Sequence, residues 1–211
     1  MSMVEERRAV LARADVSRET ADRLDRYVAL LEQWQAKTNL VAEATLPHVW
    51  SRHIADSLQF QPLFPEARRW VDIGSGGGFP GLVSAILLAG RDGADVSLIE
   101  SNAKKCAFLR TVARELRLPV TVHMKRIEDC ADVMAQAEAV SARALASLDL
   151  LCGMVSRRIS PQVPCFFAKG RNHGEEIVDA SAHWRFTVTS HASQVEDGAA
   201  VLELRDIAPR S

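Results

Sequence analysis

The sequence predicts an α/β protein with a mostly parallel, seven-stranded sheet and a helical N-terminal extension. After residue 68, short apolar runs alternate with amphipathic segments of helical length, which is typical of βαβ units in a parallel sheet. Before that point the apolar positions recur only at helical steps. The 211 residues suffice for one such domain and not for two full ones. We therefore expect an extension over residues 1–67 and one compact core over residues 68–211.

The extension is predicted to contain at least two helical segments. In the first, apolar side chains recur at steps of three and four residues, as one buried helix face requires: Leu24, Tyr27, Val28, Leu30, Leu31 and Trp34. The second segment is expected to begin after Pro47 and to end near Pro62, because prolines favour helix boundaries.

The core is predicted as an ordered series of strands and helices. The strands are expected at residues 69–73, 94–100, 120–124, 138–144, 163–170, 183–191 and 199–207. Helices are expected between the early strands, at residues 79–90, 102–118 and 148–159. The last two strands follow each other without a helix between them, so the sheet should end in an antiparallel pair.

The composition is that of an ordinary soluble globular protein, with 47% hydrophobic and 25% charged residues. The first 20 residues carry frequent charges and no apolar run approaches membrane-spanning length, so a cytoplasmic protein without a membrane partner is expected. We expect it to be a monomer. The four cysteines show neither CxxC spacing nor a nearby His pattern, which argues against a metal site and a disulfide framework. Because the net charge is only −1, any nucleic-acid-binding surface must be local.

A glycine-rich loop follows the first predicted strand, where parallel sheets bind cofactors. Glycine lets the backbone approach a ligand where a β-carbon would collide. Five glycines lie within eight residues: Gly74, Gly76, Gly77, Gly78 and Gly81. Three of them satisfy the GxGxxG pattern of NAD-binding proteins, which is weak evidence alone. Asp72 followed by GxGxG instead resembles the first motif of class I S-adenosylmethionine-dependent methyltransferases.

Glu100 ends the next predicted strand, where a carboxylate can accept hydrogen bonds from both ribose hydroxyls of either cofactor. The terminal antiparallel pair is typical of the methyltransferase sheet and not of the NAD-binding one. This favours S-adenosylmethionine as the cofactor. A NAD(P)-binding Rossmann protein and a catalytically silent binding module remain as alternatives.

Seven stretches extend the likeness over about residues 30–170. In chain order they are LLEQWQAKTNLV, SRHIADSL, DIGSGGGFPG, KKCAFLRTVARELRL, KRIED, SARALASL and FAKG. In order and spacing they resemble the GidB (RsmG) family, bacterial methyltransferases that modify ring nitrogen 7 of a guanine in 16S small-subunit ribosomal RNA. The resemblance implies S-adenosylmethionine as cofactor, and 16S ribosomal RNA or a small ribosomal subunit particle as substrate. Gly77 stands where many members have proline, which predicts a more flexible loop.

The resemblance also implies which residues contact the cofactor. They are Asp72, Gly74, Gly76, Gly78, Phe79, Glu100, Ile127, Glu128 and Arg143. Glu100 would hold the ribose, Ile127 would lie against the adenine, and Arg143 would face the cofactor carboxylate or the target nucleotide. The last three have structural alternatives, because Ile127 could belong to the core and Glu128 and Arg143 could be ordinary surface groups.

The end of the fourth predicted strand bears on the reaction. It reads SARA and lacks the Asp/Asn-Pro-Pro-aromatic clamp of enzymes that methylate exocyclic amines. Nitrogen 7 of guanine already offers a lone pair, so its methylation needs positioning more than a general base. No catalytic acid or base is therefore expected. Cys165 follows a proline, as in pyrimidine-carbon methyltransferases, but its apolar strand favours a buried structural thiol.

A local basic region could bind RNA. Residues 101–126 contain seven basic residues and one acidic residue, a net charge of +6. The candidate RNA-contacting residues are Arg52, His53, Lys104, Lys105, Arg126 and Lys169. Asp56 is expected to pair with one of the candidates near it, and His53 could instead be a buried core histidine. A small-molecule methyltransferase with the same cofactor site would not need this basic region.

Overall fold

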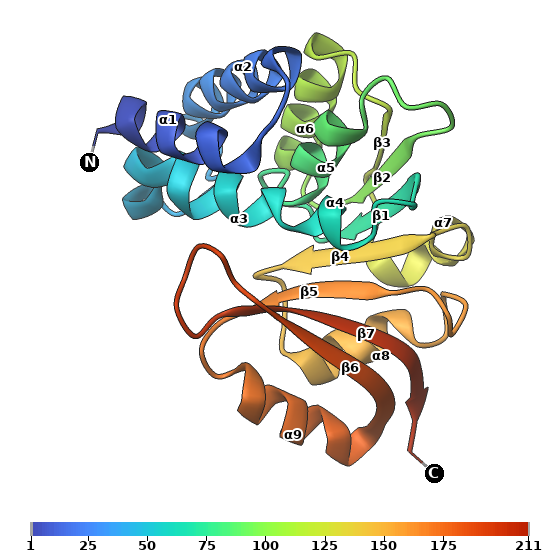
Figure 1. Ribbon diagram of the computed structural model, residues 1–211. Coiled ribbons are helices and arrows are strands. Elements are labelled where there is room, and N and C mark those ends of the chain that lie inside the picture. Colours follow the sequence, from blue (N-terminus) through green and yellow to red (C-terminus); the bar gives the residue numbers. More distant parts are fainter. Residues whose placement is uncertain (1, 211) are drawn as a thin grey trace.

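The computed structural model describes residues 2–210 and shows a central sheet with helices on both faces (Figure 1). The strand order is β3-β2-β1-β4-β5-β7-β6. The strands are β1 (Arg69–Ile73), β2 (Asp95–Ile99), β3 (Val120–His123), β4 (Ala139–Arg143), β5 (Cys165–Lys169), β6 (Trp184–Ala192) and β7 (Ala200–Pro209). Strands β1 to β5 are parallel, and β7 runs antiparallel to both β5 and β6. The predicted mostly parallel sheet with an antiparallel end is confirmed.

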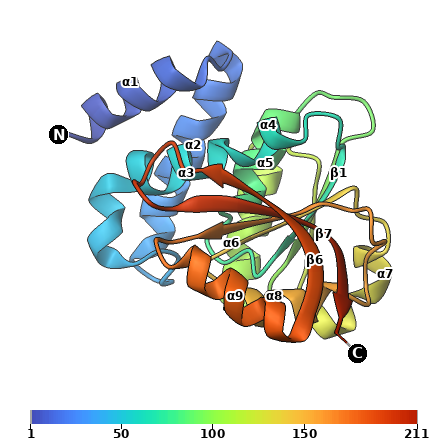
Figure 2. The ribbon, with the colours of Figure 1, turned by 60° about the horizontal axis from the view of Figure 1, so that its bottom comes forward.

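Two groups of helices of the core cover opposite faces of this sheet (Figures 1 and 2). One face carries α5 (Gly81–Leu88) and α6 (Ala103–Glu115), and the other carries α7 (Ala131–Met134), α8 (Leu148–Val155) and α9 (His173–His183). A 3₁₀ turn, η3 (Ile127–Asp129), follows β3. Helix α9 was not among the predicted elements. Ala180 is its only fully buried residue, so the helix has few of the buried apolar positions by which a core helix is predicted.

The extension is helical, as predicted, but more segmented. It comprises α1 (Met3–Ala14), α2 (Arg18–Gln35), the 3₁₀ helix η1 (Glu43–His48), the π-helical turn η2 (Trp50–Ile54), α3 (Ala55–Leu58) and α4 (Phe60–Leu63). Helix α1 has almost no buried apolar face, and its one buried residue is the carboxylate Glu6. Its sequence signal is a capping box, in which Ser2 and Glu5 exchange hydrogen bonds at the helix start.

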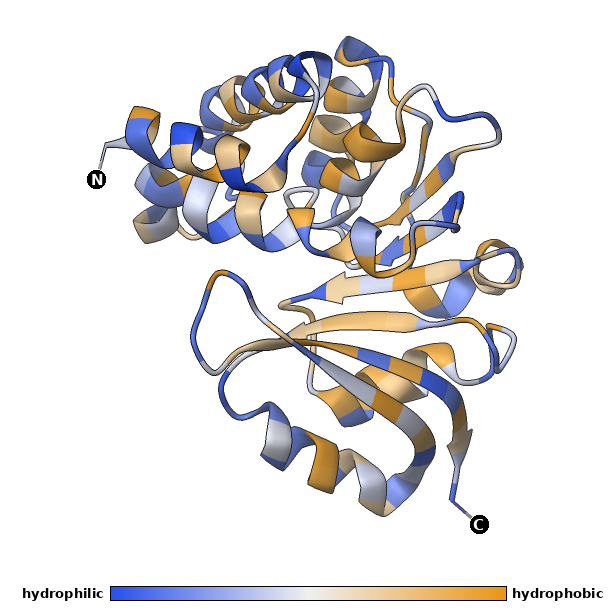
Figure 3. Ribbon diagram, viewed as in Figure 1, coloured by the Kyte–Doolittle hydropathy of each residue, from blue (hydrophilic) through white to orange (hydrophobic). Residues whose placement is uncertain are grey.

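The extension and the sheet share one hydrophobic core. Leu24 and Leu31 of α2 pack in the same cluster as Trp70 of β1 and Phe108 of α6. Alternate strand residues such as Val71 point to the other face and join a second cluster beneath α8. Figure 3 shows the resulting pattern, with orange apolar segments between the layers and blue polar segments outside. All four cysteines are buried and free, as predicted.

Over residues 2–210, none of the helices combines the length and apolar character needed to cross a membrane.

Candidate active site

A cavity of about 510 Å³ lies where the carboxyl ends of β1, β2 and β4 meet the extension. Seven of the nine residues predicted to contact the cofactor line it: Gly74, Gly76, Phe79, Glu100, Ile127, Glu128 and Arg143. The strand ends bring them together, because parallel neighbours place their carboxyl ends at one edge of the sheet.

The glycine loop forms the floor of this cavity. Gly76 has a φ of +54°, a conformation that favours glycine. A β-carbon built on Gly76 would have Gly74 O, 3.7 Å away, as its nearest neighbour. It would therefore project into the cavity and occupy space that a ligand could fill. The loop thus fits a cofactor that lies directly against the backbone.

Glu100 lies beside this loop with its side chain oriented by two backbone groups. Its Oε2 accepts a hydrogen bond from Gly76 N at 2.9 Å, and its Oε1 accepts one from Asn102 N at 2.7 Å. Each carboxylate oxygen has a second lone pair. A preoriented carboxylate with two remaining acceptor positions fits the hydroxyl pair of a ribose.

The extension supplies the opposite wall of the cavity, which the sequence analysis did not predict. Leu40, Val41 and Thr45 line it. Tyr27 Oη donates a hydrogen bond of 2.6 Å to Gly77 O, and a β-carbon at Gly77 would lie 2.9 Å from Leu40 O. The loop at Gly77, predicted to be more flexible, is therefore held between two segments of the extension. The sequence signal for this wall was the stretch NLV within LLEQWQAKTNLV, which contains Leu40 and Val41.

Asp72 and Gly78 do not line the cavity, and the structure corrects their predicted placement. The Asp72 side chain is 1% exposed beneath the loop, where Ser141 Oγ donates to its Oδ1 at 2.7 Å. Burial raises the pKa of Asp72 to about 6, although the Ser141 hydrogen bond opposes this shift. Gly78 faces Leu82 and the Tyr27 hydroxyl. Both residues therefore support the loop from beneath, and neither would contact a ligand in the cavity.

Arg143 connects the cavity to the extension through a chain of hydrogen bonds. Its Nη1 donates to Asp56 Oδ2 and its Nη2 donates to His53 Nδ1, at 3.2 and 2.7 Å. Because arginine only donates, His53 carries its proton on Nε2, which lies 2.8 Å from Thr45 Oγ1. Burial and the Arg143 charge lower the pKa of His53 to about 3. The imidazole is therefore neutral, and both of its nitrogens are engaged.

Not all predicted RNA-contacting residues reach the surface. Lys104, Lys105 and Arg126 lie at or near the mouth of the cavity, and Lys105 and Arg126 line it together with Lys125. Arg52 is exposed and pairs with Glu196 on the β6–β7 loop at 3.3 Å.

His53 and Lys169 are buried, which corrects their expected surface position. Lys169 Nζ donates to Ala146 O at 2.7 Å and pairs with Glu176 Oε2 at 2.6 Å, so its charge is neutralised inside the protein. Asp56 pairs with Arg143, and not with Arg52, His53 or Lys169 as expected. His53 follows its structural alternative, a core histidine with a satisfied ring.

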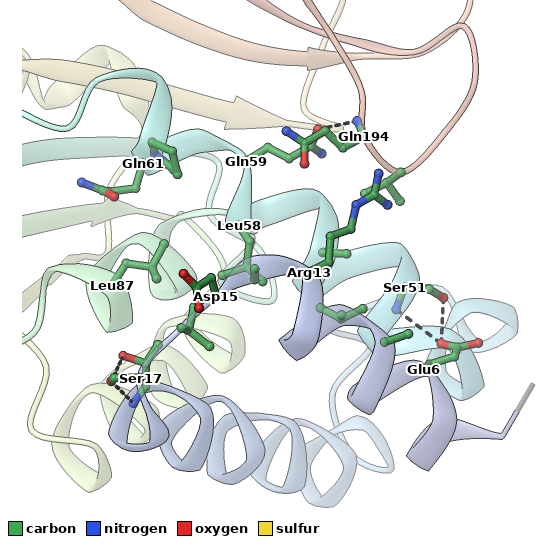
Figure 4. A pocket seen from close by; sticks show the side chains of 18 of the residues that line it. Glu6, Arg13, Asp15, Ser17, Ser51, Leu58, Gln59, Gln61, Leu87 and Gln194 are labelled. Carbon is green, nitrogen blue, oxygen red and sulfur yellow. Dashed lines mark hydrogen bonds between the residues drawn. The ribbon is translucent and has the colours of Figure 1, made fainter.

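A larger cavity, of about 700 Å³, lies between α1, the α3–α4 segment and the β6–β7 loop (Figure 4). Its wall is mostly apolar, with Val10, Leu58 and Leu87 among its members. The buried carboxylate there, Glu6, is already bound by Ser51 and His48. This cavity has no glycine loop, and its wall contains no residue from the carboxyl ends of β1 to β5, so size alone does not make it the cofactor site.

The glycine loop after β1, the oriented acid after β2 and the antiparallel β7 together define a class I methyltransferase. Solved structures share this fold. The cofactor-bound Rv0187 from MTB has a TM-score of 0.58 at 15% identity, covering 88% of this chain and 90% of that one. TrmN from Thermus thermophilus has a TM-score of 0.54 at 15% identity, covering 74% of this chain and 49% of that one.

Sequence comparison identifies the family. Residues 20–201 match the GidB family model, described as rRNA small subunit methyltransferase G, and the chain belongs to this family. The ribosomal RNA small subunit methyltransferase G of Bradyrhizobium diazoefficiens is 49% identical over 191 residues, covering 90% of this chain and 74% of that protein. The Brucella ovis protein of the same name is 44% identical over 192 residues, covering 91% and 90%. Membership excludes the NAD(P)-binding and silent-module alternatives.

Proposed function

We propose that this protein transfers a methyl group from S-adenosylmethionine to ring nitrogen 7 of a guanine in 16S small-subunit ribosomal RNA. The observation that carries the proposal is the cavity that joins a glycine cradle and an oriented carboxylate to a basic rim. In this proposal residues 1–67 form the extension and residues 68–211 the catalytic core, in one compact cytoplasmic monomer.

Side chains of the cavity would hold the cofactor along its length. Glu100 would accept from both ribose hydroxyls, because it retains an acceptor position on each oxygen. Ile127, which is 9% exposed, would lie against the adenine ring beside Glu128. Gly74 and Phe79 would border the methionine portion. When bound, S-adenosylmethionine supplies an electrophilic methyl carbon on its sulfonium.

The reaction would depend on positioning and would not need a general base. His53 is neutral, and both ring nitrogens are hydrogen-bonded. Asp72 is enclosed beneath the loop and cannot reach a substrate. Nitrogen 7 presents its own lone pair and needs no deprotonation. Arg143 would orient the target base, and stacking of its guanidinium 5.2 Å from the Phe79 ring centre would hold it in place.

The rim would bind the RNA backbone. Lys104, Lys105 and Arg126 carry no salt bridge to any residue between 2 and 210, so their charges are available to phosphates. Arg52 would add a contact on the opposite side of Arg143. A small-molecule substrate would gain nothing from such a rim, which favours RNA. Either naked RNA or the small ribosomal subunit particle could supply these phosphates.

Methyl transfer from labelled S-adenosylmethionine tests the proposal directly. Small-subunit ribosomal RNA from cells lacking the protein would be offered both naked and as the assembled particle. We expect one methyl group per RNA, on nitrogen 7 of a single guanine, in at least one of the two forms. Absence of transfer to both forms by a protein that binds the cofactor would contradict the proposal.

A further inference from the structure

A second, smaller cavity adjoins the cofactor cavity and has no role in the account above. It measures about 230 Å³ and lies between α3, the end of β5 and the β6–β7 loop. Arg143 and Ala144 line both cavities, and Asp56 lines only the smaller one. A planar group in the smaller cavity would therefore meet Arg143 at the boundary and Asp56 further in. We call this space the base slot.

The reactive atom, nitrogen 7, cannot by itself explain how the enzyme would select guanine over adenine. Adenine and guanine both present a lone pair at nitrogen 7, so methyl transfer to this atom does not by itself distinguish them. The difference lies next to it. Along the edge of guanine, nitrogen 7 is followed by the acceptor O6 and then by the donors N1–H and N2–H₂. Adenine has the reverse polarity, with the donor N6–H₂ followed by the acceptor N1.

The base slot presents its groups in the order that guanine requires. Nitrogen 7 must face the cofactor cavity, which places O6 at Arg143 and N1–H further in, at Asp56. Arg143 Nη1 donates to Asp56 Oδ2 and to Arg52 O, each at 3.2 Å, and this fixes the guanidinium beside the carboxylate. The donor left for O6 is the second Nη2 hydrogen of Arg143, and the acceptors left on Asp56 are its remaining lone pairs. This pair complements O6 beside N1–H, and it would set donor against donor and acceptor against acceptor for adenine.

Both members of the pair keep capacity for a ligand. Arg143 Nη2 donates one hydrogen to His53 Nδ1, and its second hydrogen has no partner among residues 2–210. Asp56 Oδ1 accepts from Gln59 Nε2 at 3.2 Å, which orients the carboxylate and leaves further lone pairs on its oxygens. Glu196 also lines the slot, but it lies on a loop and its side chain is 37% exposed, compared with 21% for Asp56 on α3. Asp56 is the better preorganised acceptor.

We propose that the Arg143–Asp56 pair recognises the target guanine, with Arg143 donating to O6 and Asp56 accepting from N1–H and N2–H₂. This inference rests on the proposed function, and it adds the means by which that site selects guanine over adenine. Neither residue exchanges a proton with the base, so the pair positions the base and determines specificity.

Inosine provides the test, because it keeps nitrogen 7, O6 and N1–H of guanosine and lacks only the N2 amino group. Small-subunit ribosomal RNA would be assembled by ligation with guanosine or inosine at the methylated position, and offered naked and as the particle. For the parent, inosine should lower kcat/KM roughly tenfold. Asp56→Asn should lower kcat/KM for guanosine roughly tenfold to a hundredfold, and its guanosine and inosine values should agree within about threefold.

Asp25→Asn is the matched control, because it also removes a carboxylate from an arginine–aspartate pair in the extension. It should keep the parent's activity and the parent's inosine penalty. Calorimetry should give all three proteins the same affinity for S-adenosylmethionine. Equal losses on guanosine and inosine in Asp56→Asn, or parental activity in it, would overturn the proposal.

If Asp56→Asn does not fold, the unsubstituted protein still provides a test. Equal kcat/KM values on guanosine and inosine RNA would overturn the proposal. A parent that binds the cofactor but methylates neither RNA form would refute the proposed function itself, and this inference with it. If the unsubstituted protein methylates guanosine and inosine RNA with equal kcat/KM, the proposed function stands and only the recognition of guanine by Arg143 and Asp56 is refuted.

Discussion

The interior of the cofactor cavity and its rim differ in how their polar groups are held. Inside, Glu100 and Arg143 are each fixed by neighbouring groups at 2.7 to 3.2 Å. At the rim, Lys104 and Arg126 are exposed and form no salt bridge within residues 2–210. Fixed interior groups suit a small ligand of defined shape, whereas mobile charges in water suit a flexible polyanion.

Because of this difference, substitutions in the two regions should change different measured quantities. Interior contacts are short and screened little by salt, so changes there should alter cofactor affinity at any ionic strength. Rim contacts act through phosphate charges, so changes there should alter RNA affinity and its dependence on salt. Variants of Gly76, Glu100 and the lysine pair at the rim test this separation, and a variant of Asp72 tests the carboxylate that supports the loop from beneath.

Gly76→Val should produce the largest effect, the loss of measurable cofactor binding. The new side chain would project into the cavity, because the β-carbon position faces open space. The positive φ at this residue adds a strain of about 1–3 kcal/mol, which a folded protein can tolerate. Calorimetry with S-adenosylmethionine and a thermal melt would measure both consequences. Gly174→Val is the control, since it also adds a side chain into open space but lies away from the cavity. A Gly76→Val protein with parental affinity would show that the loop is only a turn.

Glu100→Ala should weaken cofactor binding by about 1.5–3 kcal/mol, the range for hydrogen bonds to a charged group. The variant loses the acceptors for the ribose hydroxyls and also releases Gly76 N, which Glu100 holds at 2.9 Å. Glu100→Gln serves as a graded control, because its amide keeps one of the two acceptor oxygens. Titration calorimetry of a folded variant measures the change. Unaltered affinity would remove the ribose assignment from Glu100.

Replacing Lys104 and Lys105 with Glu should weaken RNA binding and leave cofactor affinity nearly unchanged. Each lost phosphate contact should flatten the log–log salt dependence by about 0.7–0.9. The matched control replaces Arg157 and Arg185 with Glu, since these exposed residues make the same charge change near the other edge of the sheet. RNA affinity at several salt concentrations measures the slopes. Equal slopes in parent and variant would move the RNA contacts to other residues, with Arg52 the first candidate.

Asp72→Asn should produce the smallest effect, a change in how stability depends on pH. The folded-state pKa of Asp72 is about 6, above its ordinary value of 3.8, so the folded protein holds a proton that the unfolded chain releases between these values. The associated stability is lost as pH rises through this window. Relative to the Asn variant, the parent's free energy of unfolding should fall by about 1 kcal/mol between pH 5 and pH 7.

Urea unfolding at both pH values measures this difference for Asp72. Exposed Asp197→Asn is the control and should follow the parent at both pH values. Parallel pH profiles for the parent and Asp72→Asn would mean that the buried carboxylate titrates normally.

Much of the site could be predicted from the sequence because it depends on local structure. A strand followed by Gly74 and Gly76 places backbone at the carboxyl edge of a parallel sheet wherever the strand lies. The same reasoning placed Glu100, which follows the next strand, whereas the role of Ile127 was implied by the family resemblance. Both residues line the cavity. Strand and helix periods likewise predicted the sheet, whereas α9, with Ala180 as its only fully buried residue, was not predicted.

The fold class, the family and the edge of the sheet that carries the site could all be predicted without coordinates, because they depend on residue periods and on the spacing of short motifs. Which polar side chains meet depends on how distant segments pack. Asp56 and Arg143 are 87 positions apart and become partners when the extension docks on β4. Lys169 was predicted to contact RNA and Asp72 to contact the cofactor, but the packing of distant segments buries both side chains. Burial and ion pairing depend on contacts between distant segments, which no local pattern specifies.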